Sequence, residues 1–154
     1  MKKKIKNILF PLHPLSNIDI EEYFKLTKIK GSVYPRDRMP KTLKPGTCMI
    51  INLGASGTNG THWISAINSK NEKSILYYDS FGVHFPPEEF LNMKHRKPIV
   101  ANDSQHQMID SFMCGYFCLK VCKSILKDGM TYQQTMEIFS DNPSDKNENL
   151  SDDL

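Results

Sequence analysis

The residues of this chain with the clearest potential for chemistry lie around Cys114. This cysteine precedes Gly115 and stands where an irregular polar segment gives way to an apolar run. Apolar residues in the run recur at helical spacing: Cys114, Phe117, Cys118, Val121, Cys122, Ile125 and Leu126. Asp110 or Ser111 is expected to cap this helix, and Asp128-Gly129 to end it. Cys114 should therefore lie near a helix N-terminus.

A helix N-terminus changes what a thiol can do. Its unpaired backbone N–H groups and the helix macrodipole favour a negative charge, and the thiolate is the nucleophilic form of cysteine. Gly115 has no side chain, and we expect it to let the backbone of a substrate approach closely. Cys118 and Cys122 share the helical face, and their spacing does not suit a zinc site. We interpret both as small buried hydrophobes.

A base and a carboxylate that could activate Cys114 occur on two consecutive strand-like runs. His62 lies at the start of the run 61–68, and Asp79 lies near the end of the run 74–81. If these runs form a hairpin that turns near residues 70–73, the partner of His62 falls within about one residue of Asp79. The carboxylate would then hold the imidazole tautomer, and a thiolate and imidazolium would act as nucleophile and general acid.

Each of these residues also has a purely structural interpretation. A histidine at a strand start is often structural, and an aspartate before a Ser-Phe-Gly turn can be a simple turn residue. Other bases are present, but none of them has a carboxylate partner on a neighbouring strand: His13, His84, His95 and His106. Gln107 is a candidate amide donor to an oxyanion hole, together with the backbone N–H of Cys114, and Gln105 is an alternative.

The remaining segments indicate one α+β domain. A third strand is expected at 47–53, so the three strands can form an antiparallel meander, and a short strand is expected at 98–101. Residues 30–44 are interpreted as an irregular connection that walls a cleft. Helices are expected at 18–26 after Ser16 or Asn17, at 88–94 after Pro86-Pro87, and at 132–139, where Thr131 and Gln134 fit a capping box. The fold class is therefore a central, mostly antiparallel sheet with the Cys114 helix packed against it.

Composition bounds the class of protein. The chain has 154 residues, of which 39% are hydrophobic and 24% charged, which suits a single globular domain. We expect that domain at residues 1–140, followed by an acidic and mobile tail at 141–154. No apolar run approaches the length of about 20 residues that a membrane span needs, and no signal-peptide pattern follows the basic start. The four cysteines do not resemble a secreted disulfide framework, so we expect a reducing compartment.

Charge is distributed unevenly along the chain. Residues 1–47 hold eleven Lys or Arg and only four Asp or Glu, although the net charge of the whole chain is +3. Such a segment can form the electrostatic footprint of a DNA-binding protein. An ordinary solvated surface has the same composition, so both interpretations stay open.

Several motifs together resemble a known family of proteases. They are Gly60-Thr-His-Trp63, Tyr78-Asp-Ser-Phe-Gly82, Gln107, and Cys114-Gly-Tyr-Phe-Cys118, in this order along the chain. This order resembles that of the adenovirus-type maturation cysteine proteases, whose clan also holds the ubiquitin-like-protein-specific proteases. Leu15-Ser-Asn-Ile-Asp-Ile20 and Tyr34-Pro-Arg-Asp-Arg-Met-Pro40 are similar to segments of virophage and Polinton-type proteases. The resemblance covers residues 12–140.

The resemblance implies a role for each matched residue. Cys114 would be the nucleophile, His62 the general base, Asp79 its orienting carboxylate and Gln107 an oxyanion donor. Gly115 would contact substrate, and Trp63, which directly follows His62, would wall a narrow channel that accepts glycine before the scissile bond. The alternative for Trp63 is an ordinary core aromatic that faces away from the cleft. No metal or cofactor is expected.

The function implied is that of a viral cysteine endopeptidase that processes capsid or other virion precursors. We expect a monomer without membrane association, located in the host cytoplasm or virus factory and in the virion. Two alternatives remain. One is a protease of ubiquitin or a ubiquitin-like modifier, and the other is a catalytically idle binding module on the same fold.

Overall fold

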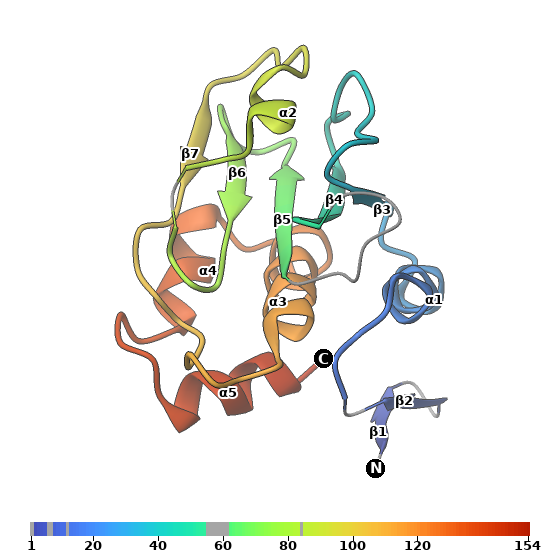
Figure 1. The fold of residues 1–154 in the computed structure, drawn as a ribbon, viewed down its shortest axis with the longest axis vertical. Helices are drawn as coiled ribbons and strands as arrows, with labels where there is room; N and C mark the ends of the chain where they lie inside the picture. Colours follow the sequence, from blue (N-terminus) through green and yellow to red (C-terminus); the bar gives the residue numbers. More distant parts are fainter. Residues whose placement is uncertain (1, 6–7, 12, 55–61, 84) are drawn as a thin grey trace.

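The computed structural model describes residues 2–5, 8–11, 13–54, 62–83 and 85–154, with side chains from residue 13 onward. These residues form a mixed α+β architecture (Figure 1). The strands are β1 (Lys2–Ile5), β2 (Ile8–Pro11), β3 (Gly31–Pro35), β4 (Thr47–Asn52), β5 (Trp63–Asn68), β6 (Ile75–Tyr78) and β7 (Ile99–Ala101), and the helices are α1 (Asn17–Thr27), α2 (Glu88–Leu91), α3 (Cys114–Leu126), α4 (Tyr132–Ile138) and α5 (Asp145–Asp152).

A five-stranded sheet in the order β3-β4-β5-β6-β7 forms the centre of the molecule. The three middle strands β4, β5 and β6 pair antiparallel, as the predicted meander requires. The edge strands β3 and β7 join their neighbours in parallel. The predicted fold class is confirmed, and the two parallel edges add a feature that the sequence pattern did not indicate.

The sheet is covered on both faces, which explains why every residue of β5 is buried. One face carries Ile50, Ile67 and Tyr78 and packs against α1, α3 and α4. The opposite face carries Ile51 and Tyr77, and it packs against Phe90 of α2 and against Met93 and Leu43. Alternate residues of each strand therefore enter different cores, because successive side chains point to opposite faces of a sheet.

Two helix starts, those of α1 and α4, follow the predicted capping residues. The side chain of Ser16 accepts from the backbone N–H of Asp19 in a complete capping box at the start of α1. Thr131 and Gln134 form the second predicted capping box, at the start of α4. The left-handed Gly129, with φ of 73°, follows the end of α3 as expected.

Three segments differ from the sequence-based predictions. Residues 31–35, expected within an irregular connection, form β3, because they find hydrogen-bond partners on β4. The β1–β2 hairpin precedes α1, in a part of the chain where no strand was predicted. Residues 145–152, expected within a mobile acidic tail, form α5, and Asn147 and Ser151 of this helix are buried. Residues 55–61, which join the strands predicted at 47–53 and 61–68, lie outside the described residues.

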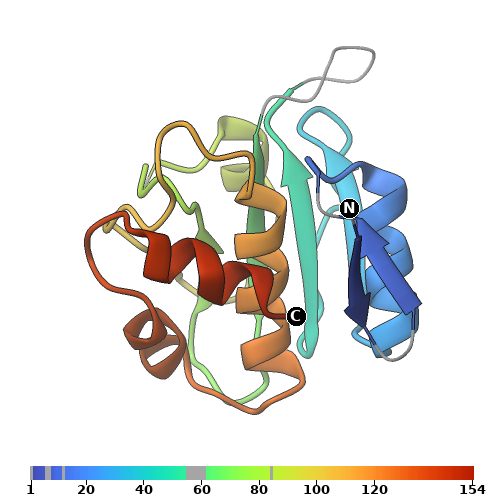
Figure 2. The ribbon, with the colours of Figure 1, turned by 90° about the horizontal axis from the view of Figure 1, so that it is seen from below.

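The arrangement brings three chain segments together at one end of the sheet. In Figure 1 the start of β5, the end of β6 and the start of α3 all lie at the lower end of the sheet, near α5. Figure 2 shows α5 crossing α3 in a view along the long axis, and α1 beside β3. Among the described residues, no helix has the length and apolar character needed to cross a membrane.

Candidate active site

His62 and Asp79 form a direct ion pair at this end of the sheet. The Nε2 atom of His62 donates to Oδ1 of Asp79 across 2.7 Å, and the two side chains are only 13% and 4% exposed. The same Oδ1 atom accepts from the backbone N–H of Phe81 at 2.9 Å. A carboxylate with two donors on one oxygen is held in place, so it can in turn hold the imidazole.

The strand register shows how this pair forms. The β5–β6 ladder ends where Ser65 pairs with Tyr78, so His62 and Asp79 both lie beyond the last paired residues. The chain turns sharply there, and the N–H of Gly82 donates to the carbonyl of Asp79 at 2.8 Å. Gly82 has φ of 74°, and a Cβ at this position would lie 2.7 Å from the backbone of Ser104. The turn, more than the strand register, therefore brings Asp79 to His62.

Asn102 fixes the backbone of Asp79. Its side-chain Oδ1 accepts from the N–H of Asp79 at 2.9 Å, and its Nδ2 donates to the carbonyl of Asp79 at 2.6 Å. Asn102 follows β7 directly and is buried. Because β7 pairs with β6, the sheet itself carries this amide to the residue it holds.

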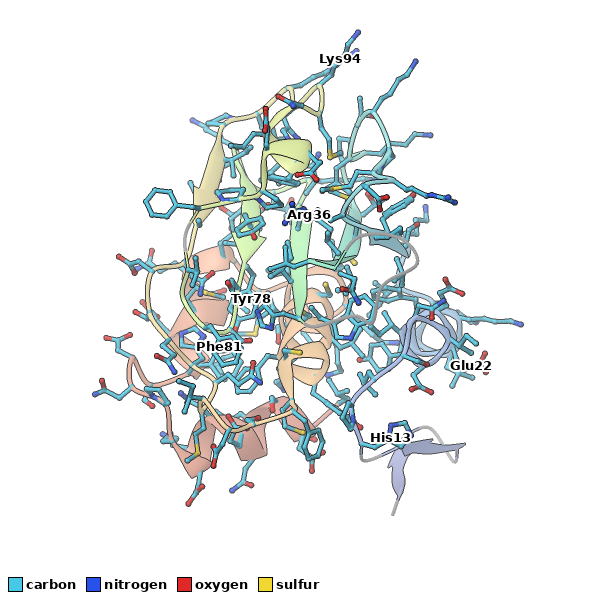
Figure 3. All side chains as sticks on the ribbon, viewed as in Figure 1. His13, Glu22, Arg36, Tyr78, Phe81 and Lys94 are labelled. Carbon is cyan, nitrogen blue, oxygen red and sulfur yellow. The ribbon has the colours of Figure 1, made fainter. Side chains whose placement is uncertain are left out.

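The environment of His62 favours its charged form. Burial by itself lowers the pKa of His62, but the hydrogen bond with Asp79, the neighbouring Cys114 as thiolate and the negative charge of Asp79 outweigh it and raise the pKa to about 9. The ring of Phe81 stacks on the imidazole with centroids 4.7 Å apart. Figure 3 labels Phe81 at this end of the sheet, while Lys94 lies at the opposite end of the molecule.

Cys114 differs from the other three cysteines in exposure. It is the first residue of α3 and is partly exposed, whereas Cys48, Cys118 and Cys122 are buried. Met113 takes the N-cap position and provides no side-chain cap bond, so the first N–H groups of α3 are not capped by that residue. The predicted cap residue Ser111 instead accepts from the N–H of Met113 at 3.0 Å.

Cys118 and Cys122 are buried in the core as expected. Burial raises the pKa of both thiols well above the ordinary range. The Cys118 thiol also donates to the carbonyl of Trp63 at 3.4 Å. Both thiols therefore stay protonated and inert at neutral pH, since the thiolate is the reactive form.

Gln107 is fully buried and held by several hydrogen bonds. Its Oε1 accepts from the hydroxyl of Ser80 at 2.6 Å, and its Nε2 donates to the carbonyl of Ser111 at 2.9 Å. Ser111 stands three residues before Cys114, so this amide lies against the segment that leads into α3. The alternative amide, of Gln105, donates to the backbone carbonyl of Gln107 at 2.9 Å.

Trp63 and Gly115 pack against one another in the core. The indole of Trp63 is 9% exposed, and its N–H donates to the carbonyl of Leu15 at 2.9 Å. A Cβ at Gly115 would lie 3.1 Å from the Leu15 side chain and 3.3 Å from the indole of Trp63. Gly115 thus allows the close packing of α3 on these two residues, which differs from the substrate approach expected of it. Contact of either residue with substrate stays a prediction.

The described rival histidines are engaged elsewhere. Nδ1 of His106 and the hydroxyl of Tyr78 share a buried hydrogen bond of 2.9 Å, and burial lowers the pKa of His106 to about 4. His95 hydrogen-bonds the carbonyl of Phe90, and His13 that of Pro14. His84 lies outside the described residues. Among those residues, no cluster of three or more His, Cys, Asp or Glu could hold a metal ion.

Comparison with known proteins gives a match at the level of three-dimensional structure. No family model and no curated protein sequence matches the chain. The crystal structure of the ASFV pS273R protease aligns with a TM-score of 0.62 and 14% identity, over 97% of this chain and 69% of that one. The chain shares the fold of the ASFV pS273R protease. At this identity the likeness establishes the fold and not the activity.

Two further structures align less closely. A selenomethionine structure of the ASFV pS273R protease aligns with a TM-score of 0.49 and 20% identity, over 68% of this chain and 41% of that one. The SUMO protease Ulp1, with its catalytic cysteine oxidised to a sulfinic acid, aligns with a TM-score of 0.34 and 16% identity. The alignment covers 79% of this chain and 57% of that one. This chain therefore spans between 41% and 69% of the length of these structures.

Sequence reasoning missed three residues that support the site: Ser80, Phe81 and Asn102. Ser80 and Phe81 directly follow Asp79, and this adjacency was the available signal. Asn102 gave no signal, because it is distant in sequence and reaches Asp79 only through the pairing of β7 with β6.

Proposed function

We propose that this chain is a cysteine endopeptidase with Cys114 as nucleophile, His62 as base and Asp79 as orienting carboxylate. One observation carries the proposal: the imidazole of His62 pairs with Asp79 at 2.7 Å, and Cys114 lies close enough to raise the pKa of that imidazole. The thiol stands at the start of α3, where the macrodipole stabilises a thiolate. The fold shared with the ASFV pS273R protease supports the same function.

The proposed reaction proceeds through an acyl-enzyme. The thiol proton of Cys114 resides on His62 as imidazolium, and the resulting thiolate attacks the scissile carbonyl carbon. The resulting oxyanion accepts hydrogen bonds from the backbone N–H of Cys114 and from Nε2 of Gln107. The imidazolium then gives its proton to the leaving amine, and a water molecule deprotonated by His62 hydrolyses the thioester.

The proposed substrate is a capsid or other virion precursor cut after glycine. This choice rests on the resemblance of the His62, Asp79, Gln107 and Cys114 motifs to adenovirus-type proteases. Trp63, invoked as the wall of a narrow channel, packs in the core, so the glycine preference draws its support from the resemblance alone. The enzyme would act in the host cytoplasm or virus factory and in the virion.

A cleavage experiment tests activity and substrate together. The wild type and Cys114→Ala are incubated with the capsid precursor of the same genome and, separately, with a fluorogenic ubiquitin substrate. Mass spectrometry should find capsid fragments ending in glycine with the wild type only. Cleavage of the ubiquitin substrate alone would favour the modifier-protease alternative. No cleavage of either substrate or of a random peptide library would favour an idle binding module.

We also propose that DNA binds a basic surface away from Cys114. Two adjacent pockets of about 530 and 340 Å³ are lined by lysines and by no acidic residue: Lys28, Lys30, Lys41, Lys44, Lys70 and Lys127. Lys127 follows the last residue of α3, whereas Cys114 begins that helix, so bound DNA would leave the site open. The side chains of Lys2, Lys3, Lys4 and Lys6 lie outside the described residues.

Salt dependence tests this surface. Affinity for duplex DNA should fall steeply as the salt concentration rises. Replacing Lys30 and Lys44 by alanine should reduce the slope of log binding constant against log salt concentration by about two. The matched control replaces Lys94 and Lys146, which lie outside both pockets. An unchanged slope in the Lys30 and Lys44 variant, or no binding at low salt, would contradict the assignment.

A further inference from the structure

We propose that Ser80 is a positioning residue that sets the orientation of the Gln107 side-chain amide. The catalytic consequence rests on the proposed protease function, whereas the orientation of the amide does not. Ser80 follows Asp79 directly in the turn after β6. Ser80 and Gln107 are both fully buried, so the contact between them is shielded from water.

Ser80 holds Gln107 through side chain and backbone. Its hydroxyl donates to Oε1 of Gln107 at 2.6 Å. Its carbonyl accepts from the N–H of Gln107 at 3.0 Å and from the N–H of His106 at 2.8 Å. The residue thus fixes both the chain position of Gln107 and the tip of its side chain.

The remaining contacts of Gln107 define which amide atom faces where. A carbonyl can only accept, so the atom of Gln107 that contacts Ser111 O at 2.9 Å must be Nε2. Oε1 then faces Ser80, whose hydroxyl can donate to it. An amide nitrogen carries two hydrogens, and within the described part of the chain only the one on Ser111 has an assigned acceptor. The second is the hydrogen that an oxyanion could accept.

The Ser80 hydroxyl also acts on the strength of this donor. A hydrogen bond to an amide oxygen polarises the amide and makes its N–H groups better donors. Removing the hydroxyl leaves Oε1 buried without its partner, and only the hydrogen bond from Nε2 to the Ser111 carbonyl would then hold the amide. The turn at Asp79-Ser80 therefore serves two groups at once, because Asp79 holds His62 while Ser80 holds Gln107.

Kinetics of Ser80→Ala test the catalytic part. We expect kcat to fall about tenfold or more, with little change in KM. The upper limit is the loss of about 10²–10³ in kcat that follows when a whole oxyanion donor is removed. In a Gln107→Ala background the same substitution should cost no further activity, because the donor it orients is gone. Ser65→Ala is the matched control: Ser65 is equally buried on the neighbouring strand β5, and its hydroxyl has no partner among the described residues.

An independent measurement keeps the orientation testable without turnover. In ¹⁵N-labelled Ser80→Ala protein, the side-chain amide protons of Gln107 should change their chemical shifts and exchange faster with water. In Ser65→Ala the same Gln107 protons should give the wild-type signals. Unchanged Gln107 signals, or equal kcat losses from Ser80→Ala with and without Gln107, would overturn the proposal. A wild type that cleaves nothing would refute the protease function, and the amide signals would still decide the role of Ser80. If Ser80→Ala does not fold, Ser80→Cys replaces it in both the kinetic and the NMR experiment. Cysteine keeps only a weak hydrogen-bond donor at this position.

Discussion

Nε2 of His62 and Oδ1 of Asp79 lie 2.7 Å apart, so the imidazole is anchored through Nε2. Because Nε2 is engaged with the carboxylate, Nδ1 is the ring nitrogen that remains to serve Cys114 in the proposed reaction. In that reaction the imidazole serves the carboxylate through one nitrogen and the thiol through the other. This linear order of groups is what a cysteine nucleophile with an orienting carboxylate requires.

Cys114 should be the reactive thiol. Cys114→Ala is expected to abolish cleavage and to keep the melting temperature, because the residue is partly exposed at the start of α3. Iodoacetamide at neutral pH should label Cys114 first, as read by mass spectrometry. Cys118→Ala is the control, and we expect it to act through packing, since Cys118 is fully buried. Faster labelling of Cys118 or Cys48 would contradict the assignment.

Asp79 should support the charge on His62. Asp79→Asn is expected to lower activity less than His62→Ala, because an amide can still orient the ring but cannot stabilise imidazolium. The pKa of His62 is about 9, raised from 6.5, so the pairing stabilises the fold fully below 6.5 and is lost as pH rises through 9. An NMR titration should show this pKa falling in Asp79→Asn. Wild-type turnover in Asp79→Ala would remove Asp79 from the mechanism.

Gln107 should contribute to kcat more than Gln105 does. Gln107→Ala is expected to lower kcat by about 10²–10³ with little change in KM, as loss of one oxyanion donor does. Gln105→Ala should have the smaller effect, because its amide serves only the backbone carbonyl of Gln107. Steady-state kinetics of the two variants on one peptide decide between them, and a larger loss in Gln105→Ala would reverse the choice.

His106 should make the fold sensitive to acid. Burial lowers its pKa to about 4, against a smaller raising effect of Asp141, so the unfolded chain binds a proton that the folded one does not. Stability should therefore fall between pH 6.5 and 4, by up to about 1.4 kcal/mol per pH unit for one proton. His106→Phe keeps the stacking on Tyr78 and Phe139. Urea unfolding should show that it reduces the pH dependence of the free energy of unfolding, whereas the same change at the exposed His13 should not.

Asn147 should anchor α5 to the segment that carries Gln107. Its Nδ2 donates to the carbonyls of Ser140 at 2.9 Å and His106 at 3.3 Å, and its Oδ1 accepts from the N–H of Ser140 at 2.9 Å. Asn147→Ala removes the partner of all three groups, at a cost of about 1–3 kcal/mol for a group that water cannot reach, here the carbonyl of His106. Asn149→Ala, an exposed asparagine on the same helix, should cost little in the same urea titration.

The sequence by itself determined the local elements of this protein. The spacing of apolar residues after Cys114 set α3, and Ser16 and Thr131 set two helix starts, because these signals act between residues a few positions apart. The sequence also indicated that His62 and Asp79 lie close together, although the hairpin register alone was not what joined them.

Only the tertiary structure decided the contacts between distant segments. Asn102 reaches Asp79 because β7 joins the sheet in parallel, and Ser80 reaches Gln107 because the turn after β6 packs against the segment before α3. The acidic C-terminal segment forms α5 because the buried Asn147 finds partners 41 residues away at His106 and nearby at Ser140. Such contacts depend on side-chain partners that no periodicity encodes, since each is set by the packing of whole elements.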